Sequence, residues 1–220
     1  MNVLTVEELR EMMICVCDRV AAEERRLCEL DSFVGDGDHG VTAARGFRAV
    51  KKVLESKRYQ SMEELLEEAA ETLSETMGGA IGPIFGSIFE GAAESAAGRS
   101  RLTAVEMGEM LEQGLKEVKM IGGAKEGDRT LVDCLAPAVR ALKEAAGAGA
   151  DLSEALMRAA DAGAEGVEAT KKMVAKKGRA KFLQEKSLGH QDAGATSMWI
   201  VLKAMSDYCA GNIERNRKCL

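Results

Sequence analysis

The first regular pattern in the chain is the segment TVEELREMMICVCDRV, residues 5–20. Thr5, followed three residues later by Glu8, forms the capping-box signature, in which each side chain binds a backbone N–H group at the start of a helix. Behind it, apolar side chains recur at intervals of three and four residues, which places them on one face of a helix: Leu9, Met12, Met13, Val16 and Val20. The segment therefore predicts an amphipathic helix with one buried face.

The same start signal recurs at three places, each before a new amphipathic run: Ser61 with Glu64, Thr103 with Glu106, and Asp151 with Glu154. Helical spacing also continues through four further stretches, at about 40–55, 80–98, 131–146 and 194–210. No internal repeat and no long alternating pattern is present, so a solenoid or a large sheet is not expected. The sequence predicts about eight helices in one all-α domain, residues 1–220.

The apolar run IGPIFGSIF, residues 81–89, has a composition that would also suit a strand. Gly82, Pro83 and Gly86 interrupt it, and an alanine-rich stretch continues it to Ala97. Proline is well tolerated in the first turn of a helix, and small residues allow helices to approach closely. This run is therefore interpreted as the start of a tightly packed helix.

The composition restricts the class of protein. Of the 220 residues, 46% are hydrophobic and 30% are charged, as in a soluble globular protein, and the net charge of −6 argues against nucleic acid as a direct partner. No stretch approaches the roughly 18 apolar residues of a membrane span. Six cysteines are scattered without zinc-site spacing and are interpreted as reduced, buried thiols: Cys15, Cys17, Cys28, Cys134, Cys209 and Cys219. We expect a cytoplasmic protein with no membrane contact.

The segment LDSFVGDGDHG, residues 30–40, concentrates three acids among glycines. Carboxylates this close repel one another unless a cation or strong donors neutralise them, and all-oxygen ligation suits Mg²⁺, Mn²⁺ or Ca²⁺. An EF-hand is excluded by spacing, because the twelfth position counted from Asp36 is Phe47 rather than glutamate. A helix beginning near His39 would also direct its N-terminal amides at a phosphate. A solvated acidic turn that binds no metal remains the alternative on spacing alone.

Four motifs in this chain resemble those of the nucleotide-binding L subunit of the dihydroxyacetone kinases. They are GDGDHGVTAARGF at 35–47, MGGAIGPIFG at 77–86, GDRTLVD at 127–133, and KGRA at 177–180 with GHQDAGATS at 189–197. They occur in the order and spacing of the family and cover nearly the whole chain.

The resemblance implies an up-and-down barrel of eight helices with the nucleotide bound in the loops at one end. It implies that Asp31, Asp36 and Asp38 bind two Mg²⁺ ions and, with His39, form the catalytic set. The residues that it places on ADP or ATP are His39, Gly40, Thr42, Gly79, Ala80, Ile81, Gly122, Leu131, Arg179, Asp192, Ala193 and Gly194.

The resemblance also implies an activity and partners. The bound nucleotide would pass a phosphoryl group to a short ketose held on a separate K-type subunit, and a phosphoprotein of the phosphotransferase system would recharge it. The acceptor stays open between dihydroxyacetone and a tetrulose such as erythrulose. Two other interpretations stay open: a nucleotide-dependent regulator that docks onto a transcription factor, and a helical structural module whose acidic turn binds metal without nucleotide.

Three positions depart from the family pattern. Ile81 stands where a phosphate-facing serine is usual, Thr42 where asparagine is common, and Ala193 where a proline stiffens the loop. None of them removes a metal ligand. Losing one phosphate donor would cost on the order of 1–3 kcal/mol.

The remaining polar residues of the motifs have more local interpretations. His190 is expected to orient the loop that contains Asp192, and Arg179 to bind phosphate with its guanidinium group. Asp128 and Asp133 are interpreted as helix caps rather than metal ligands. A structural role for His39, with its ring paired to Asp38, stays open beside phosphate binding. Trp199 and the methionines at helical spacing are expected to pack in the core.

Overall fold

The structure is a computed structural model that describes residues 1–211, so Cys219 lies outside the described residues. Nine α-helices are present in this part: α1 (Val6–Ala22), α2 (Glu24–Ser32), α3 (His39–Ser56), α4 (Met62–Thr76), α5 (Ile81–Ala96), α6 (Ala104–Gly122), α7 (Val132–Gly147), α8 (Leu152–Ala169) and α9 (Ala193–Cys209). Two 3₁₀ segments, η1 (Thr170–Lys172) and η2 (Arg179–Ser187), lie between α8 and α9. The two-residue strands β1 (Leu4–Thr5) and β2 (Arg101–Leu102) pair antiparallel.

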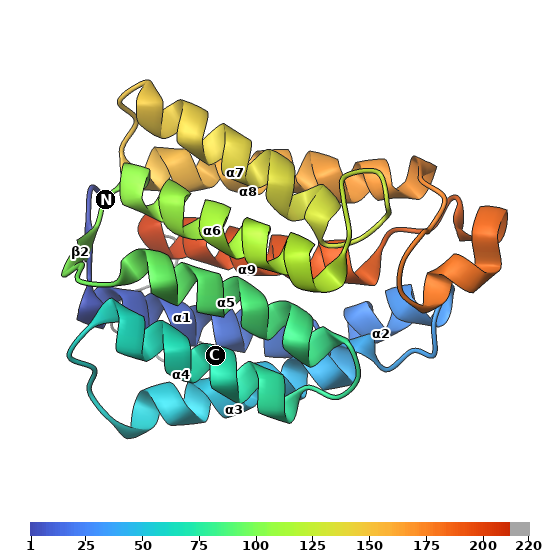
Figure 1. The fold of residues 1–220 in the computed structure, drawn as a ribbon, viewed down its shortest axis with the longest axis horizontal. Coiled ribbons are helices and arrows are strands. Elements are labelled where there is room, and N and C mark those ends of the chain that lie inside the picture. The colour runs from blue at the N-terminus through green and yellow to red at the C-terminus, as the bar shows by residue number, and fades with distance from the viewer. Residues whose placement is uncertain (212–220) are drawn as a thin grey trace.

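Eight of these helices form a closed ring. Each helix from α3 to α9 packs against the next one along the chain, and α1 closes the ring by packing against both α3 and α9. The helices lie along the long axis of the molecule and run up and down, as Figure 1 shows. The predicted all-α, eight-helix barrel is therefore confirmed.

Local sequence signals fix where several helices begin. Thr5 and Thr103 each accept a hydrogen bond from the backbone of the glutamate three residues on, and that glutamate binds back to the threonine N–H, so both capping boxes form as predicted. Ser61 caps α4 and Asp151 caps α8, since each side chain accepts a hydrogen bond from the backbone N–H group of the glutamate three residues on. The ambiguous run that begins at Ile81 is helical throughout, as interpreted from its sequence.

Glycines let the central helices pack closely. A Cβ atom at Gly114 of α6 would lie 2.6 Å from the carbonyl oxygen of Ile88 in α5, and one at Gly91 of α5 would lie 2.9 Å from that of Gln113 in α6. Both distances are too short for a side chain, so the backbones approach where only glycine fits. The aromatic core beside them is built on Phe47, whose ring meets Phe85 edge-on at 5.8 Å and Phe89 at 6.5 Å.

Helix α2 is the element that the sequence analysis did not anticipate. It is separated from α1 by Glu23 alone, whose backbone leaves the helical conformation (φ −90°, ψ 7°). It lies at one end of the barrel, against α3 and α9. The connections α2–α3, α4–α5, α6–α7 and α8–α9 all gather at this end, on the right of Figure 1, whereas the N-terminus and the β-pair lie at the other.

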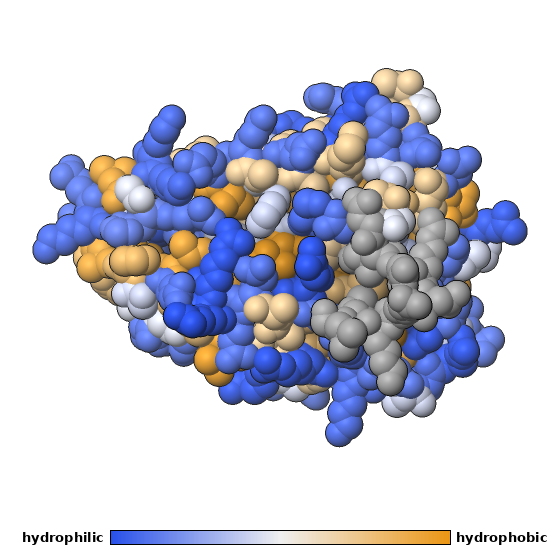
Figure 2. Space-filling model, turned by 180° about the vertical axis from the view of Figure 1, so that it is seen from behind, coloured by the Kyte–Doolittle hydropathy of each residue, from blue (hydrophilic) through white to orange (hydrophobic). Residues whose placement is uncertain are grey.

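The outer surface is mainly polar. Figure 2 shows the side opposite to that in Figure 1, where hydrophilic side chains dominate and hydrophobic residues appear between them in small patches. Among the described helices, none has a stretch long and apolar enough to cross a membrane.

Candidate functional site

The α2–α3 connection brings three carboxylates together. Asp31 lies in the last turn of α2, Asp36 in the loop, and Asp38 at the N-cap of α3. One oxygen atom from each lies within 4.8 Å of the others. The loop turns back on itself because Gly37 has a φ of 76°, and its N–H group donates a 2.9 Å hydrogen bond to Asp31 Oδ2. The acids predicted from spacing thus converge on one point.

This oxygen set fits a divalent cation. The cluster is half-buried to exposed and contains no sulfur or nitrogen ligand, which matches the preference of Mg²⁺ for carboxylates with room left for water and phosphate oxygens. One positive charge already neutralises part of it: the Arg179 guanidinium group forms an ion pair with Asp36. Arg179 therefore reaches the acidic loop from 143 residues away in sequence.

A cleft of about 530 Å³ opens beside the carboxylates at this end of the barrel. The three predicted metal ligands and most of the residues that the resemblance implies at the nucleotide line it: Asp31, Asp36, Asp38, His39, Thr42, Gly79, Ala80, Ile81, Leu131, Arg179, Asp192, Ala193 and Gly194. They come from four separate connections, which the barrel brings to one side.

Gly40 and Gly122, also expected at the nucleotide, are not among the residues that line the cleft. A Cβ atom at Gly40 would lie 2.8 Å from the backbone nitrogen of Cys28 and closer still to the carbonyl oxygen of Glu24, so Gly40 lies where α3 touches α2. Gly122 ends α6 beside Ile84, whose Cδ1 would lie 2.9 Å from an added Cβ. Both positions serve helix packing at the border of the cleft.

His39 is held by a hydroxyl group. Its Nε2 lies 3.0 Å from Ser197 Oγ of α9, and among the described residues no ion pair joins its ring to Asp38. Burial lowers the pKa of His39, and the nearby Asp31 charge opposes that shift. A neutral imidazole at the start of α3 can donate one hydrogen bond and accept another without adding charge.

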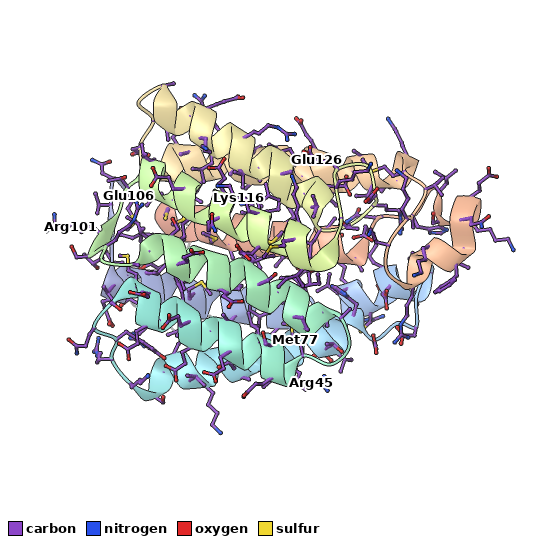
Figure 3. The ribbon with its side chains drawn as sticks, in the orientation of Figure 1. Arg45, Met77, Arg101, Glu106, Lys116 and Glu126 are labelled. Atoms are coloured by element: carbon purple, nitrogen blue, oxygen red, sulfur yellow. The ribbon has the colours of Figure 1, made fainter. Side chains whose placement is uncertain are left out.

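The α4–α5 turn forms one side of the cleft. Arg45 of α3 donates a 2.8 Å hydrogen bond from Nε to the carbonyl oxygen of Thr76, and Met77 is buried against Gly46 (Figure 3). These contacts fix the turn that leads through Gly79, whose φ is 67°, to Ile81 at the start of α5. The backbone N–H groups of this helix start are therefore presented to the cleft.

Two carboxylates, Asp128 and Asp133, accept hydrogen bonds from the backbone of the α6–α7 connection. Asp133 accepts hydrogen bonds from the backbone N–H groups of Gly127, at 2.5 Å, and Thr130, at 2.8 Å. Asp128 accepts from the backbone of Lys125, at 3.1 Å. Both carboxylates therefore organise the backbone of the connection before α7. The interpretation as helix caps is wrong, because the N-cap of α7 is Leu131 without a side-chain hydrogen bond, and Asp133 lies in the first turn of the helix.

The turn before α9 closes the cleft from the other side. Asp192 caps α9 through a 2.8 Å hydrogen bond from the Ala195 N–H group, and its own N–H group donates to Thr170 Oγ1 at 3.0 Å. Burial raises the pKa of Asp192 to about 6. The ring of His190 stacks on Phe33, with centroids 4.9 Å apart, so this turn also contacts the end of α2.

Several lining residues were not singled out from the sequence: Val34, Val41, Arg45, Gly78, Ile84, Phe85, Arg129, Thr130, Lys177, Gly178 and Ala180. The apolar members follow helical periodicity and looked like ordinary core positions. Arg129 and Lys177 lie inside two of the four motifs, and this is the sequence feature that could have identified them as lining residues.

A family comparison agrees with this arrangement. The model of the DAK2 domain matches residues 33–207, which includes Asp36, Asp38 and the other residues that line the cleft, whereas Asp31 lies just before the matched segment. The chain belongs to the DAK2 domain family. The resemblance to the L subunit of the dihydroxyacetone kinases is thereby confirmed.

Individual relatives of this DAK2-domain chain cover it almost completely. The ADP-binding subunit DhaL of the PEP-dependent dihydroxyacetone kinase of Escherichia coli is 34% identical over 189 residues, 86% of this chain and 90% of that protein. The L-erythrulose kinase of Pectobacterium atrosepticum is 35% identical over 191 residues, again 86% of this chain but 32% of that longer protein.

A solved structure shares the fold. The dihydroxyacetone kinase of C. freundii in complex with AMP-PNP and Mg²⁺ superposes with a TM-score of 0.73 at 29% identity. The match covers 90% of this chain and 33% of that protein, so this chain corresponds to about a third of the larger kinase.

Proposed function

We propose that this chain is the nucleotide-binding subunit of a short-ketose kinase. The observation that carries the proposal is the convergence of Asp31, Asp36 and Asp38 to within 4.8 Å at the edge of a cleft lined by the family motifs. A cleft of about 530 Å³ has the size of a small-molecule site. Positioning and charge neutralisation are what phosphoryl transfer requires of a protein.

The three carboxylates would hold two Mg²⁺ ions against the phosphates of ADP or ATP. Bound Mg²⁺ supplies positive charge that neutralises the phosphate oxygens as the phosphoryl group leaves. Asp31 is oriented for this task by the Gly37 N–H group. Asp38 lies at the N-cap of α3 without a side-chain cap hydrogen bond, so its carboxylate would be available to a metal ion. Because Arg179 pairs with Asp36, its guanidinium group would also lie close to a phosphate held by these ions.

The other lining residues divide between the two ends of a nucleotide. His39 and Arg179 offer donors or positive charge near the carboxylates, where the phosphates would lie, and Lys177 adds a positive charge to the lining of the cleft. Ile84, Phe85 and Leu131 offer apolar surface for a base. With the base against these three apolar side chains, the phosphates would lie at the metal-binding carboxylates.

The cleft end of the barrel also has the surface expected for a partner. Six of the eight exposed large hydrophobic side chains among the described residues belong to the connections at this end or to the helix turns beside them: Phe33, Val41, Met120, Ile121, Phe182 and Leu188. Apolar residues gathered around a polar site are typical of a protein interface. We propose a K-type, ketose-binding subunit as the partner here, with a phosphotransferase-system phosphoprotein that recharges the nucleotide, both in the cytoplasm.

Calorimetric titration of ADP, with and without Mg²⁺, tests the nucleotide site. We expect one magnesium-dependent site per chain. Absence of binding in both conditions would contradict the proposal. A matched pair of variants locates the site: Asp38→Asn should weaken binding, whereas Asp161→Asn on α8, outside the cleft, should bind as the unmodified protein does.

The acceptor sugar has two candidates, because both a dihydroxyacetone kinase subunit and an L-erythrulose kinase are about equally similar to this chain. Dihydroxyacetone is our first choice, since the relative named for it matches this chain over nearly its full length. Turnover of each sugar, measured with the cognate K-type subunit and either a phosphoprotein or free ATP as donor, distinguishes the two. Turnover of erythrulose alone would favour the second candidate.

A further inference from the structure

Arg129 is the most deeply buried cation of the described residues. Its side chain has 0% exposure, although it carries a full positive charge and lines the cleft. Buried charges are costly unless they are paired and hydrogen-bonded. Two of its nitrogen atoms, Nε and Nη1, nevertheless have no hydrogen-bond partner. This combination calls for a functional explanation.

The backbone at this position is also constrained. Arg129 has a φ of 60°, in the left-handed region, and it is one of two residues other than glycine with positive φ among the described residues. Such a conformation persists only where surrounding contacts impose it, and it is frequent at functional sites. Here Asp133 imposes it by binding the N–H groups of Gly127 and Thr130 on either side.

The residues that Arg129 contacts through its guanidinium group belong to the turn before α9. Its Nη2 donates a 2.9 Å hydrogen bond to the carbonyl oxygen of His190, and its Nη1 lies 3.6 Å from Asp192 Oδ1. The second distance is too long for a hydrogen bond but would become one if the turn moved inward by less than an ångström. The guanidinium group thus binds the turn at His190 and lies close to Asp192, while its Nη1 donor remains without a hydrogen bond.

We propose that Arg129 is a positioning residue that holds the Asp192–Gly194 turn in the conformation that binds nucleotide, and that its free Nη1 donor binds Asp192 when the turn closes. The inference rests on the proposed function, because the nucleotide is what the turn would close on. Arg129 reaches this turn from the α6–α7 connection, 61 residues away in sequence, so the hold joins two of the connections that line the cleft.

The charge environment of Asp192 supports this role. Three charged groups act on its carboxylate: Arg129 from the α6–α7 loop, Asp133 from α7, and Asp31 from α2. Of these only Arg129 lowers the pKa, so its loss should raise the pKa of Asp192 above its present value of about 6. The pH dependence of nucleotide binding therefore reports whether Arg129 and Asp192 act together.

The test uses the complete chain with three variants. Arg129→Met removes the donors and the charge, Arg129→Lys keeps the charge but cannot span both partners, and Arg158→Met removes an exposed arginine of α8 as a control. Circular dichroism and thermal melts establish that each variant is folded. If Arg129→Met does not fold, the Arg129→Lys variant decides the outcome.

Two measurements are made on each protein. Hydrogen exchange of residues 188–196, recorded without nucleotide, reports on the turn itself. Calorimetry between pH 5 and 8.5 gives the affinity for Mg²⁺-ADP relative to the unmodified protein, and this ratio cancels the titration of the nucleotide phosphates.

We expect Arg129→Met to exchange faster in this segment and to bind Mg²⁺-ADP about tenfold more weakly. The loss should be largest just above pH 6, where Asp192 is ionised in the unmodified protein but not in the variant. Arg129→Lys should restore the pH profile but only part of the affinity, and Arg158→Met should change neither. Unchanged exchange and affinity in Arg129→Met would overturn the inference. If the unmodified protein binds no Mg²⁺-ADP, the proposed function fails instead, and faster exchange would still support the hold on the turn.

Discussion

Replacing Gly40 by alanine tests how the metal loop is held in place. The alanine Cβ atom would lie 2.8 Å from both the backbone nitrogen and the sulfur of Cys28, and closer to the Glu24 carbonyl oxygen. Two of these atoms belong to the α2 backbone, so a change of side-chain conformation cannot relieve the clash. Helices α2 and α3 must therefore move apart. Overpacking of this kind costs about 1–3 kcal/mol, and we expect the upper part of that range.

Denaturant unfolding measures this cost directly. A loss of about 3 kcal/mol corresponds to a melting temperature lower by about 6–12 °C for a domain of this size. Since Asp31 lies on α2 and Asp38 at the start of α3, the separation should also weaken Mg²⁺-dependent ADP binding. Gly147→Ala at the end of α7 is the control, because an added Cβ there meets nothing within 4 Å.

The two possible roles of Gly40 give different results. Alanine keeps the backbone N–H group, so a role limited to an amide contact with nucleotide would leave the stability unchanged. A Gly40→Ala protein with unaltered stability and affinity would refute the packing argument. A loss of affinity at full stability would place Gly40 at the ligand, as the family resemblance implies.

Four further predictions follow from individual residues. Asp36→Asn should abolish Mg²⁺-dependent phosphotransfer in a kinase assay without lowering the melting temperature, because the side chain is 37% exposed. Ile81→Ser should restore a hydroxyl at the start of α5 and tighten Mg²⁺-ADP binding by about tenfold in calorimetry. Gln184→Gly should raise the unfolding free energy by about 1 kcal/mol, because residue 184 has φ 47° and ψ −122°, a conformation that favours glycine. Burial raises the pKa of Asp192 to about 6, so the folded state binds its proton more tightly than the unfolded chain does. The free energy of unfolding should therefore fall as the pH rises from about 4 to about 6. Asp192→Asn should remove that part of the pH dependence in denaturant titrations at several pH values.

The sequence by itself determined the helices of the ring and the acidic loop, but not α2. The capping boxes at Thr5 and Thr103 and the apolar spacing behind them act within one or two turns of helix, so they could be read before any fold was known. Asp31, Asp36 and Asp38 lie within eight positions, which made their convergence predictable from glycine turns and spacing.

Only the tertiary structure decided which distant groups complete the site. Arg179 pairs with Asp36 across 143 positions, and His39 meets Ser197 across 158, because ring closure of the barrel brings alternate connections to one end. Arg129 looks like one polar residue of a loop motif until the fold buries it behind the Asp192 turn. Helix patterns and short motifs follow from nearest neighbours along the chain, whereas burial and pairing of charges depend on which segments the packing of the whole barrel places side by side.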